Sequence, residues 1–264
     1  MIETKDLEDH GAVVFVHILK TGGSTLKRIL ASQYGDEEAY FINPPFDDSI
    51  VTEFLTLPEE RRKKLKLIAG HGSQGLVKYM EPPFIIYALF RNPIDQLVSY
   101  YYYAKKTPTN HYYERLNAGM DIVQFSSELV AYNLQSRAME LLLEKEDRMK
   151  LDLILELIKG GRVKFGLLEQ FDESILMLAR ELGWKKPPYY TSWLNVNKSR
   201  PAVEELPPDV ARRLKEINHN DVELYKVARE IFTEELSVQG AGFAEEVAKF
   251  KVENLRRQQA ASVR

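Results

Sequence analysis

The fold of this chain is decided by residues 13–30, VVFVHILKTGGSTLKRIL. An apolar run ends at His17, a Lys-Thr-Gly-Gly turn follows, and apolar residues return with helical spacing from Leu26. This order predicts a strand, a tight loop and a helix. The paired glycines allow backbone N–H groups to approach an anion closely, and Ser24 or Thr25 can cap the helix. Such N–H groups, together with the positive end of the helix dipole, favour a bound phosphate.

The lysine of this loop is displaced from the position that a nucleotide-hydrolysing loop requires. The Walker A motif has Lys directly after its last Gly, followed by Ser or Thr. Here Ser24 follows Gly23, and Lys20 comes two residues before Gly22. The pattern His-x-x-Lys-Thr-Gly-Gly-Ser resembles the 5′-phosphosulfate loop of sulfotransferases that use PAPS (3′-phosphoadenosine 5′-phosphosulfate). It is most similar to the branch that contains the glycan 2-O-sulfotransferases, although that branch commonly has Pro at the position of Leu19.

The resemblance implies a reaction and a role for each residue of the loop. A sulfuryl group would pass in line from PAPS to an acceptor hydroxyl, releasing PAP (3′-phosphoadenosine 5′-phosphate). Lys20 would lie at the bridging oxygen, and the next five residues would bind the 5′-phosphate: Thr21, Gly22, Gly23, Ser24 and Thr25. Such a transfer depends on alignment and on neutralising the charge of the leaving group. Lysine and N–H groups already match that charge, so we expect no metal.

A second motif follows the apolar run Phe84–Phe90, which predicts a buried strand. Arg91 ends this strand, and Ser99 lies two turns along the predicted helix that follows. The segment Leu89–Tyr101 is similar to the 3′-phosphate motif of the same family, in which Arg and Ser bind that phosphate. A guanidinium suits this role because its N–H groups can bind phosphate in a bidentate manner.

Three residues are candidates for the base that deprotonates the acceptor hydroxyl. His71 lies between two glycines after a predicted strand, and in the glycan 2-O-sulfotransferases a histidine of the corresponding Gly-His segment is the proposed base. Neutral imidazole suits that role near pH 7. His17 is a competitor within the first loop. Glu53 is the reserve, because many other sulfotransferases use a glutamate, whereas His111 and His219 are expected at the surface.

Two later segments carry further candidate contacts. The long stretch of turns at 183–208 contains Lys198 and Arg200, which could close over the nucleotide as a basic loop. Asn133 and Gln135 resemble an Asn-x-Gln element of the branch that contains the glycan 2-O-sulfotransferases, in which these polar side chains could face the acceptor. Three aromatic residues of the long stretch either line the adenine or acceptor pocket or simply pack the loop: Tyr189, Tyr190 and Trp193.

Predicted strands alternate with helices along the chain, at residues 13–16, 65–69, 84–90 and 162–168. The connection Gly35–Asp48 is expected to be irregular. This order favours an α/β fold, similar to the sulfotransferase fold, in which helices cover both faces of a P-loop-like parallel sheet and the C-terminal half is largely helical. In such sheets ligands bind outside the carboxyl ends of the strands. Because Lys20, His71 and Arg91 each follow a predicted strand, we expect them to meet at that edge.

Length, composition and net charge limit the classes to which this protein can belong. With 264 residues, we expect a single domain over 1–264, with a tail at 1–11 and an exposed terminal helix within 244–264. A net charge of −3 argues against a general nucleic-acid binder. The absence of Cys excludes disulfides and thiolate metal sites. The acidic start is not a signal peptide, and no apolar run is long enough to span a bilayer.

These features indicate a cytoplasmic enzyme or a domain excised from a longer protein. The expected partner is a glycan or small-molecule acceptor with a hydroxyl group, and nothing in the sequence indicates an oligomeric state. A nucleotide kinase or NTPase would instead need a lysine after Gly23 and an Asp at the end of a later strand, where this chain has Arg91. A non-catalytic nucleotide-binding module is the third class. The joint presence of Lys20, His71, Arg91 and Ser99 argues against that class.

Overall fold

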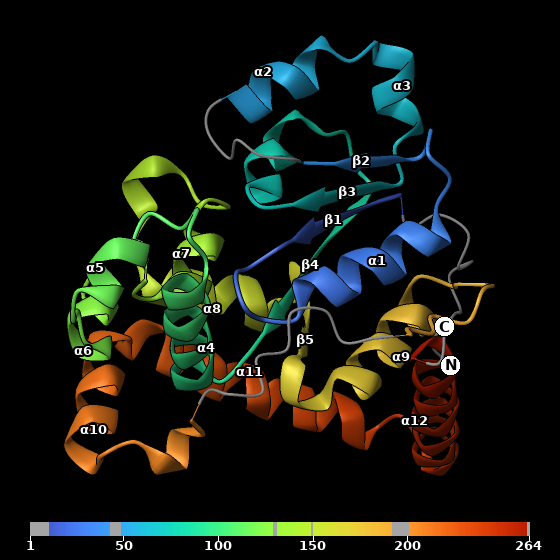
Figure 1. Ribbon diagram of the computed structural model, residues 1–264. Coiled ribbons are helices and arrows are strands. Elements are labelled where there is room, and N and C mark those ends of the chain that lie inside the picture. Colours follow the sequence, from blue (N-terminus) through green and yellow to red (C-terminus); the bar gives the residue numbers. More distant parts are fainter. Residues whose placement is uncertain (1–10, 43–48, 129–130, 149, 192–200, 263–264) are drawn as a thin grey trace.

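The computed structural model describes residues 11–42, 49–128, 131–148, 150–191 and 201–262. Its centre is a five-stranded sheet with the order β2-β3-β1-β4-β5, and every pair of neighbouring strands is parallel (Figure 1). The strands are β1 (Ala12–Val16), β2 (Ala39–Phe41), β3 (Leu67–Gly70), β4 (Phe84–Phe90) and β5 (Val163–Leu167).

Strand β1 lies between β3 and β4, and all five of its residues are buried. Burial of the whole strand explains its continuous apolar sequence, which is typical of a parallel sheet covered on both faces. The register places Val16 opposite Gly70 of β3 and Ala88 of β4. The carboxyl ends of the three strands therefore lie side by side, and the loops that follow them share one edge of the sheet.

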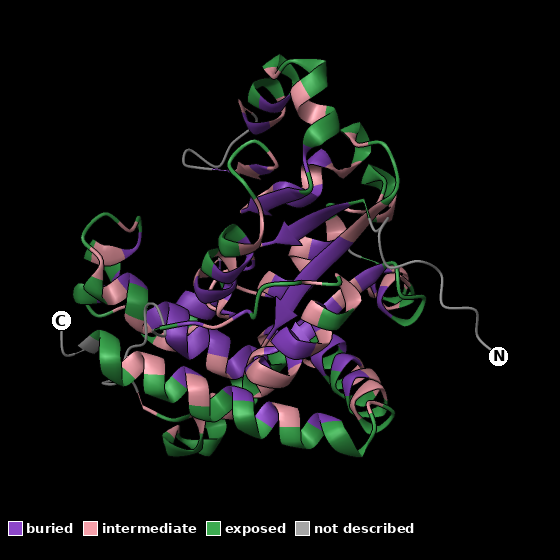
Figure 2. Ribbon diagram, turned by 90° about the vertical axis from the view of Figure 1, so that its right-hand side faces the viewer, coloured by how far each residue is buried: buried purple, intermediate pink, exposed green. Residues whose placement is uncertain are grey.

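Helices cover both faces of the sheet, and alternate residues of β1 face the two layers. Val13 and Phe15 pack in the core beneath one layer, and Val16 packs in the core beneath the other. Figure 2 shows the strands buried beneath helices whose outer surfaces are exposed. The first layer consists of α1 (Gly23–Gln33), α9 (Phe171–Glu181) and α12 (Ala241–Ser262), and the second of α7 (Leu134–Glu140), α8 (Leu151–Lys159) and α11 (His219–Ser237).

The remaining helices form two satellite groups beside the sheet (Figure 1). One group consists of α4 (Pro93–Lys106), α5 (Tyr113–Asn117), α6 (Ile122–Ser126) and α10 (Pro208–Ile217). The other packs against β2 and β3 and consists of α2 (Ser49–Thr56) and the 3-10 helix η1 (Ser73–Tyr79). Between them in the chain lies α3 (Glu59–Lys64), which has no buried residue. The described residues form three further short 3-10 helices: η2 (Lys145–Asp147), η3 (Leu168–Gln170) and η4 (Val203–Glu205).

The predicted fold class is confirmed, and the strand Phe84–Phe90 has the bounds that the apolar run indicated. The connection Gly35–Asp48 is not wholly irregular, because β2 occurs within it and pairs with β3. This edge strand has only three residues, and only Ala39 is buried. A pattern that short carries no period from which a strand can be predicted.

A terminal helix was expected within 244–264, and α12 is that helix, but its start and its burial differ from the expectation. The helix begins at Ala241, and its residues Phe243, Val247 and Phe250 are buried in the same core as α9. The three apolar residues occupy one face of the helix, because they recur at intervals of four and three. Charged residues elsewhere on α12 concealed this face in the sequence.

The aromatic residues before the undescribed segment pack against the same helix. The Tyr189 ring stacks on Phe250 with centroids 5.5 Å apart, and the backbone N–H of Tyr190 donates to Asn254 Oδ1 at 3.1 Å. These two tyrosines therefore pack the loop, the second of the two roles considered for them. Trp193 lies outside the described residues.

If α12 is an integral part of the core, Phe250→Ala should lower the free energy of unfolding by about 3 kcal/mol, the range typical of a buried Phe. Phe250 is 5% exposed, whereas Val252 on the same helix is 70% exposed. The control Val252→Ala should change the free energy of unfolding by less than about 0.5 kcal/mol. Urea unfolding measures both values. Equal values for the two variants would contradict the packing of α12.

Candidate active site

The loop between β1 and α1 is held in a conformation that two glycines make sterically accessible. Gly22 has φ 86°, in the left-handed region that glycine enters without a steric penalty, and it is the N-cap of α1. A Cβ on Gly23 would lie 2.1 Å from His17 Cδ2, so the close approach of the imidazole requires glycine there. Lys20 also has a positive φ, of 63°, which is unusual for a residue with a side chain.

Backbone N–H groups of this loop are available to a ligand. No described residue accepts a hydrogen bond from the N–H of Thr21, Gly22 or Gly23. The first N–H groups of any α-helix lack an intrahelical acceptor. The helix dipole adds positive potential at the same place. The loop therefore has the chemistry of an anion cradle.

The hydroxyl side chains of the loop do not have the capping role that the sequence predicted for them. Ser24 and Thr25 lie inside α1, and neither caps it, because the N-cap residue is Gly22. Thr21 is buried, and its Oγ1 donates to the carbonyl of Ile18 at 3.1 Å. The Thr21 hydroxyl thus closes the turn, so only its N–H remains available to a ligand.

Arg91 joins the two motifs that the sequence separates by about 70 residues. Its Nη1 donates to the carbonyl oxygen of Lys20 at 2.9 Å. From the same helix start, Gln96 Nε2 donates to the carbonyl of Leu19 at 2.7 Å. Two side chains after β4 therefore bind two consecutive carbonyls of the loop after β1. The predicted meeting of Lys20 and Arg91 at one sheet edge agrees with this contact.

The side chains of Lys20 and Arg91 also contact helix α4. Lys20 Nζ lies 4.2 Å from the centroid of the Tyr103 ring, a cation–π contact. Arg91 Nη2 lies 3.8 Å from Asp95 Oδ1, which is beyond hydrogen-bond distance. Ser99 follows Asp95 by four residues, so the two lie on one helix face, and Ser99 is 8% exposed. Arg91, which precedes α4, thus lies beside Asp95 of the first turn, and Ser99 follows on the same face of the helix.

Two of the three candidate bases lie together. The rings of His17 and His71 stack with centroids 4.2 Å apart and planes 17° apart. Burial, and to a lesser extent the nearby charges of His71 and Lys27, together lower the pKa of His17 to about 3. Burial also lowers the pKa of His71, while a hydrogen bond to the main chain of His17 acts in the opposite direction. Both imidazoles are therefore neutral near pH 7.

The remaining candidate residues are either exposed or outside the described part of the chain. Glu53 is exposed on α2, where it accepts a hydrogen bond from Ser49 Oγ at 3.2 Å. Lys198 and Arg200 lie outside the described residues. The two exposed histidines, His111 and His219, are surface residues, as predicted.

The Asn-x-Gln element does not face outward. Asn133 and Gln135 are 4% and 1% exposed, and the side chains of both bind main-chain groups of the protein. Two other contributors were not identified from the sequence, Gln96 and Tyr103. Gln96 is a buried polar residue within the apolar face of α4, and that anomaly was the available signal. Tyr103 belongs to a run of four tyrosines in which no residue stands out.

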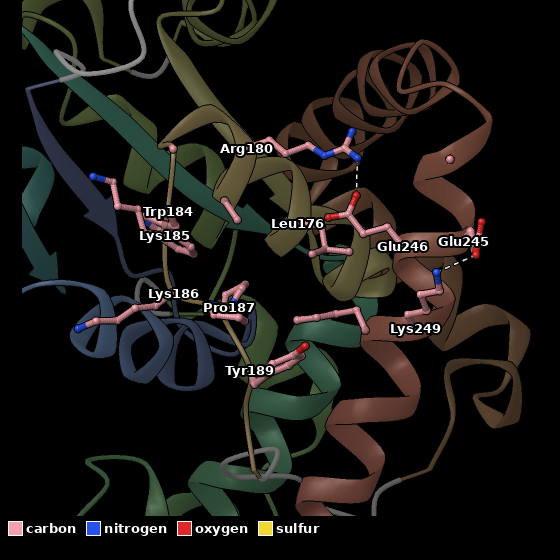
Figure 3. A pocket seen from close by; sticks show the side chains of 15 residues that line it. Leu176, Arg180, Trp184, Lys185, Lys186, Pro187, Tyr189, Glu245, Glu246 and Lys249 are labelled. Atoms are coloured by element: carbon pink, nitrogen blue, oxygen red, sulfur yellow. Dashed lines mark hydrogen bonds and ion pairs between the residues drawn. The ribbon is translucent and has the colours of Figure 1, made fainter.

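A sizeable pocket, of about 660 Å³, lies elsewhere (Figure 3). It is formed by the end of α9, the segment after it and α12. Four of its charged side chains form ion pairs, since Arg180 binds Glu246 and Lys249 lies 2.7 Å from Glu245. None of the described residues of the two phosphate motifs lines it. We therefore assign the site from the loops and not from this pocket.

Comparison with known proteins gives the family. A family model described as the sulfotransferase family matches residues 5–227. The chain belongs to the sulfotransferase family. The structure of mouse sulfotransferase SULT7A1 complexed with PAP is 14% identical to this sulfotransferase, covers 87% of this chain and 90% of that chain, and has a TM-score of 0.47. No curated protein matches the chain.

Membership confirms the resemblance drawn from the first loop and makes the chain a sulfotransferase enzyme. It does not distinguish the glycan 2-O branch from other members. Within the described ranges, no group of three His, Cys, Asp or Glu side chains could hold a metal ion. None of the helices described for this sulfotransferase is both long and apolar enough to cross a membrane.

The buried histidine should make the stability of this sulfotransferase sensitive to acid. As pH falls, the unfolded chain protonates His17 near the ordinary value of 6.5, whereas the folded residue stays neutral down to about 3. The free energy of unfolding should therefore decrease below about pH 6.5, by up to about 1.4 kcal/mol per pH unit for this one proton. Urea unfolding between about pH 7.5 and 5 measures the slope. His17→Gln should flatten it, and His111→Gln, at an exposed position, should not; an unchanged slope in His17→Gln would contradict the assignment.

Proposed function

We propose that this sulfotransferase moves a sulfuryl group from PAPS to an acceptor hydroxyl and releases PAP. The observation that carries the proposal is the 2.9 Å hydrogen bond from Arg91 to the carbonyl of Lys20. It makes one continuous site of two anion-binding motifs. PAPS suits such a site, because it carries a 3′-phosphate as well as the 5′-phosphosulfate.

The 5′-phosphate would bind the N–H groups of Thr21, Gly22 and Gly23 at the start of α1. This location supplies donors and a favourable dipole without any side-chain charge. Ser24 and Thr25 would add to the cradle from the first turn of the helix. Arg91 and Ser99 would bind the 3′-phosphate, which would compete with Asp95 for the guanidinium. Lys198 and Arg200 would close over the nucleotide.

Lys20 would neutralise the charge that develops on the bridging oxygen as the sulfur–oxygen bond breaks. Its ammonium would exchange the ring of Tyr103 for that oxygen. Only the side chain needs to move, because Arg91 holds the Lys20 carbonyl. A preorganised charge at the place where negative charge develops is an effective way to lower such a barrier.

His71 would accept the proton of the acceptor hydroxyl as the new sulfur–oxygen bond forms. A neutral imidazole has one N–H donor and one acceptor nitrogen. A hydrogen bond to the main chain of His17, together with stacking on the His17 ring, would orient the His71 imidazole. His17 is the poorer base, because a pKa of about 3 leaves it little affinity for a proton near neutral pH.

We propose a carbohydrate or another hydroxylated metabolite as the acceptor, on the basis of the resemblance to the glycan branch. Assays with labelled PAPS and a panel of acceptors would separate these classes. The panel should contain neutral and sulfated oligosaccharides, sterols and phenols. Transfer to an oligosaccharide alone would support the glycan assignment, and transfer to phenols or sterols alone would exclude it.

Ligand specificity tests the nucleotide assignment. Saturating PAP should raise the melting temperature without magnesium, because a ligand at 100 times its Kd stabilises the folded state by about 2.7 kcal/mol. ATP with magnesium should have little effect, because the lysine that cradles its phosphates in a Walker loop is missing. Differential scanning fluorimetry measures both shifts. Equal stabilisation by ATP with magnesium would favour the kinase or NTPase alternative.

Two substitutions separate the chemical step from nucleotide binding. Lys20→Ala should lower kcat by roughly 10²- to 10³-fold, as expected for the loss of a group that stabilises the leaving oxygen. His71→Ala should lower kcat by roughly 10²- to 10⁴-fold while leaving the Kd for PAP within about twofold. Single-turnover kinetics and calorimetry measure the two quantities, with His219→Ala as the surface control. Loss of PAP binding in His71→Ala would assign His71 to the nucleotide and not to the acceptor.

A further inference from the structure

The side chain of Gln135 binds both main-chain groups of Arg91. Its Oε1 accepts from the Arg91 N–H at 2.8 Å, and its Nε2 donates to the Arg91 carbonyl at 2.8 Å. Arg91 is the first residue after β4, where a chain that leaves a sheet also leaves its ladder of hydrogen bonds. A carboxamide is the side chain that can both donate to and accept from one residue in this way. Gln135 therefore fixes the backbone from which the guanidinium extends.

Gln135 is itself held by a buried carboxylate. Asp221 of α11 accepts the N–H of Gln135 at 2.9 Å and the N–H of Ser136 at 2.7 Å, and Ser136 Oγ donates to it at 2.7 Å. Asp221 is 2% exposed. Its carboxylate satisfies N–H groups at the start of α7, as a capping residue would, but it comes from a different helix.

A second pair of residues fixes the same two helix starts. The N–H of Asn133 donates to Asn218 Oδ1 at 2.8 Å, and the N–H of Asp221 donates to Asn133 Oδ1 at 3.2 Å. Asn133 has φ 46°, a left-handed conformation that Asn tolerates better than most residues. The start of α7 is thus bound to the start of α11 in both directions.

At its other end this network reaches the first loop. Arg91 Nη1 binds the Lys20 carbonyl, and Glu169 Oε1 accepts the N–H of Asn92 at 2.8 Å. A continuous series of hydrogen bonds therefore runs from Asp221 through Gln135 and Arg91 to Lys20. Its members come from α11, α7, the end of β4 and the loop after β1.

We propose that Gln135, held by Asp221, is a positioning residue for nucleotide binding and sulfuryl transfer. It orients the Arg91 backbone so that the guanidinium can meet the 3′-phosphate and hold the carbonyl of Lys20. The inference rests on the proposed function, since it takes PAPS as the nucleotide. A leucine of similar volume would fill the same buried space, so packing alone does not account for an amide with both of its polar ends bound to one residue.

The test compares two nucleotides that differ at the group in question. PAP carries the 3′-phosphate, and adenosine 5′-monophosphate does not. Gln135→Leu should weaken PAP binding roughly tenfold, which corresponds to about 1.4 kcal/mol. The same variant should leave the affinity for adenosine 5′-monophosphate within about twofold, because that ligand lacks the 3′-phosphate and because Gln96 still holds the loop that would bind its 5′-phosphate, through the carbonyl of Leu19. Isothermal calorimetry on the full chain gives both constants.

A matched control distinguishes positioning from a general loosening of the fold. Gln239→Leu also removes an amide with two hydrogen bonds, to Arg180 and to the carbonyl of Glu235, but outside the site. It should change neither affinity. In an Arg91→Ala background, Gln135→Leu should cause no further loss of PAP affinity. Should Gln135→Leu fail to fold, Asp221→Asn keeps the shape of the side chain and should reduce PAP affinity in the same selective way.

Several results would overturn the inference. If Gln135→Leu weakened both nucleotides by the same factor, or neither of them, its role would be structural only. A full additional loss of PAP affinity in the Arg91→Ala background would also contradict the proposed route. If the unaltered chain failed to bind PAP, the proposed function would fail instead. The two conclusions therefore have separate tests.

Discussion

The pairing of β1 between β3 and β4 is the constraint on which the site depends. Because the three strands are parallel and in fixed register, the loops that leave them start from the same edge of the sheet. One loop supplies an anion cradle, the second supplies an imidazole and the third supplies a guanidinium. The parallel sheet therefore brings together residues that are far apart in the chain. Side-chain contacts, such as the hydrogen bond from Arg91 to the carbonyl of Lys20, then join the loops.

The electrostatics of the site follow from unequal burial. His17 and His71 are buried enough to stay neutral, so in the proposed complex the positive charge near the nucleotide would come from Lys20, Arg91 and the dipole of α1. Protonation of the two histidines would remove the proton acceptor that the proposed mechanism assigns to His71. Desolvation of the imidazoles is therefore consistent with that proposed role, and it makes the folded state less stable in acid.

The sequence was informative where a local pattern determines structure. The strand, loop and helix around Lys20 and the strand that ends before Arg91 were predictable, because apolar runs, paired glycines and helical spacing act over a few residues. The parallel sheet then implied that these loops converge. The family resemblance added roles for Lys20 and Arg91 that no spacing could supply.

Features that depend on distant partners were not predictable. Gln135 and Asp221 are 86 positions apart, and nothing near either residue indicates that they bind. The N-cap of α1 is Gly22 because of its backbone angle, so the prediction that Ser24 or Thr25 caps the helix is wrong. The apolar face of α12 was concealed because its three core residues are scattered among many charged ones. In each case the sequence near the residue did not show which part of the chain or which backbone angle determines its environment.

The contact between Gly23 and His17 has a consequence for how this enzyme can change. His17 lies against the cradle on one side and against His71 on the other, with no room for a Cβ at position 23. A side chain at position 23 would therefore displace the ring that stacks on His71. Under the proposed function, this contact couples the geometry of the nucleotide loop to that of the residue that activates the acceptor. Engineering of new acceptor specificity should therefore begin at side chains outside this contact and leave Gly23, His17 and His71 unchanged.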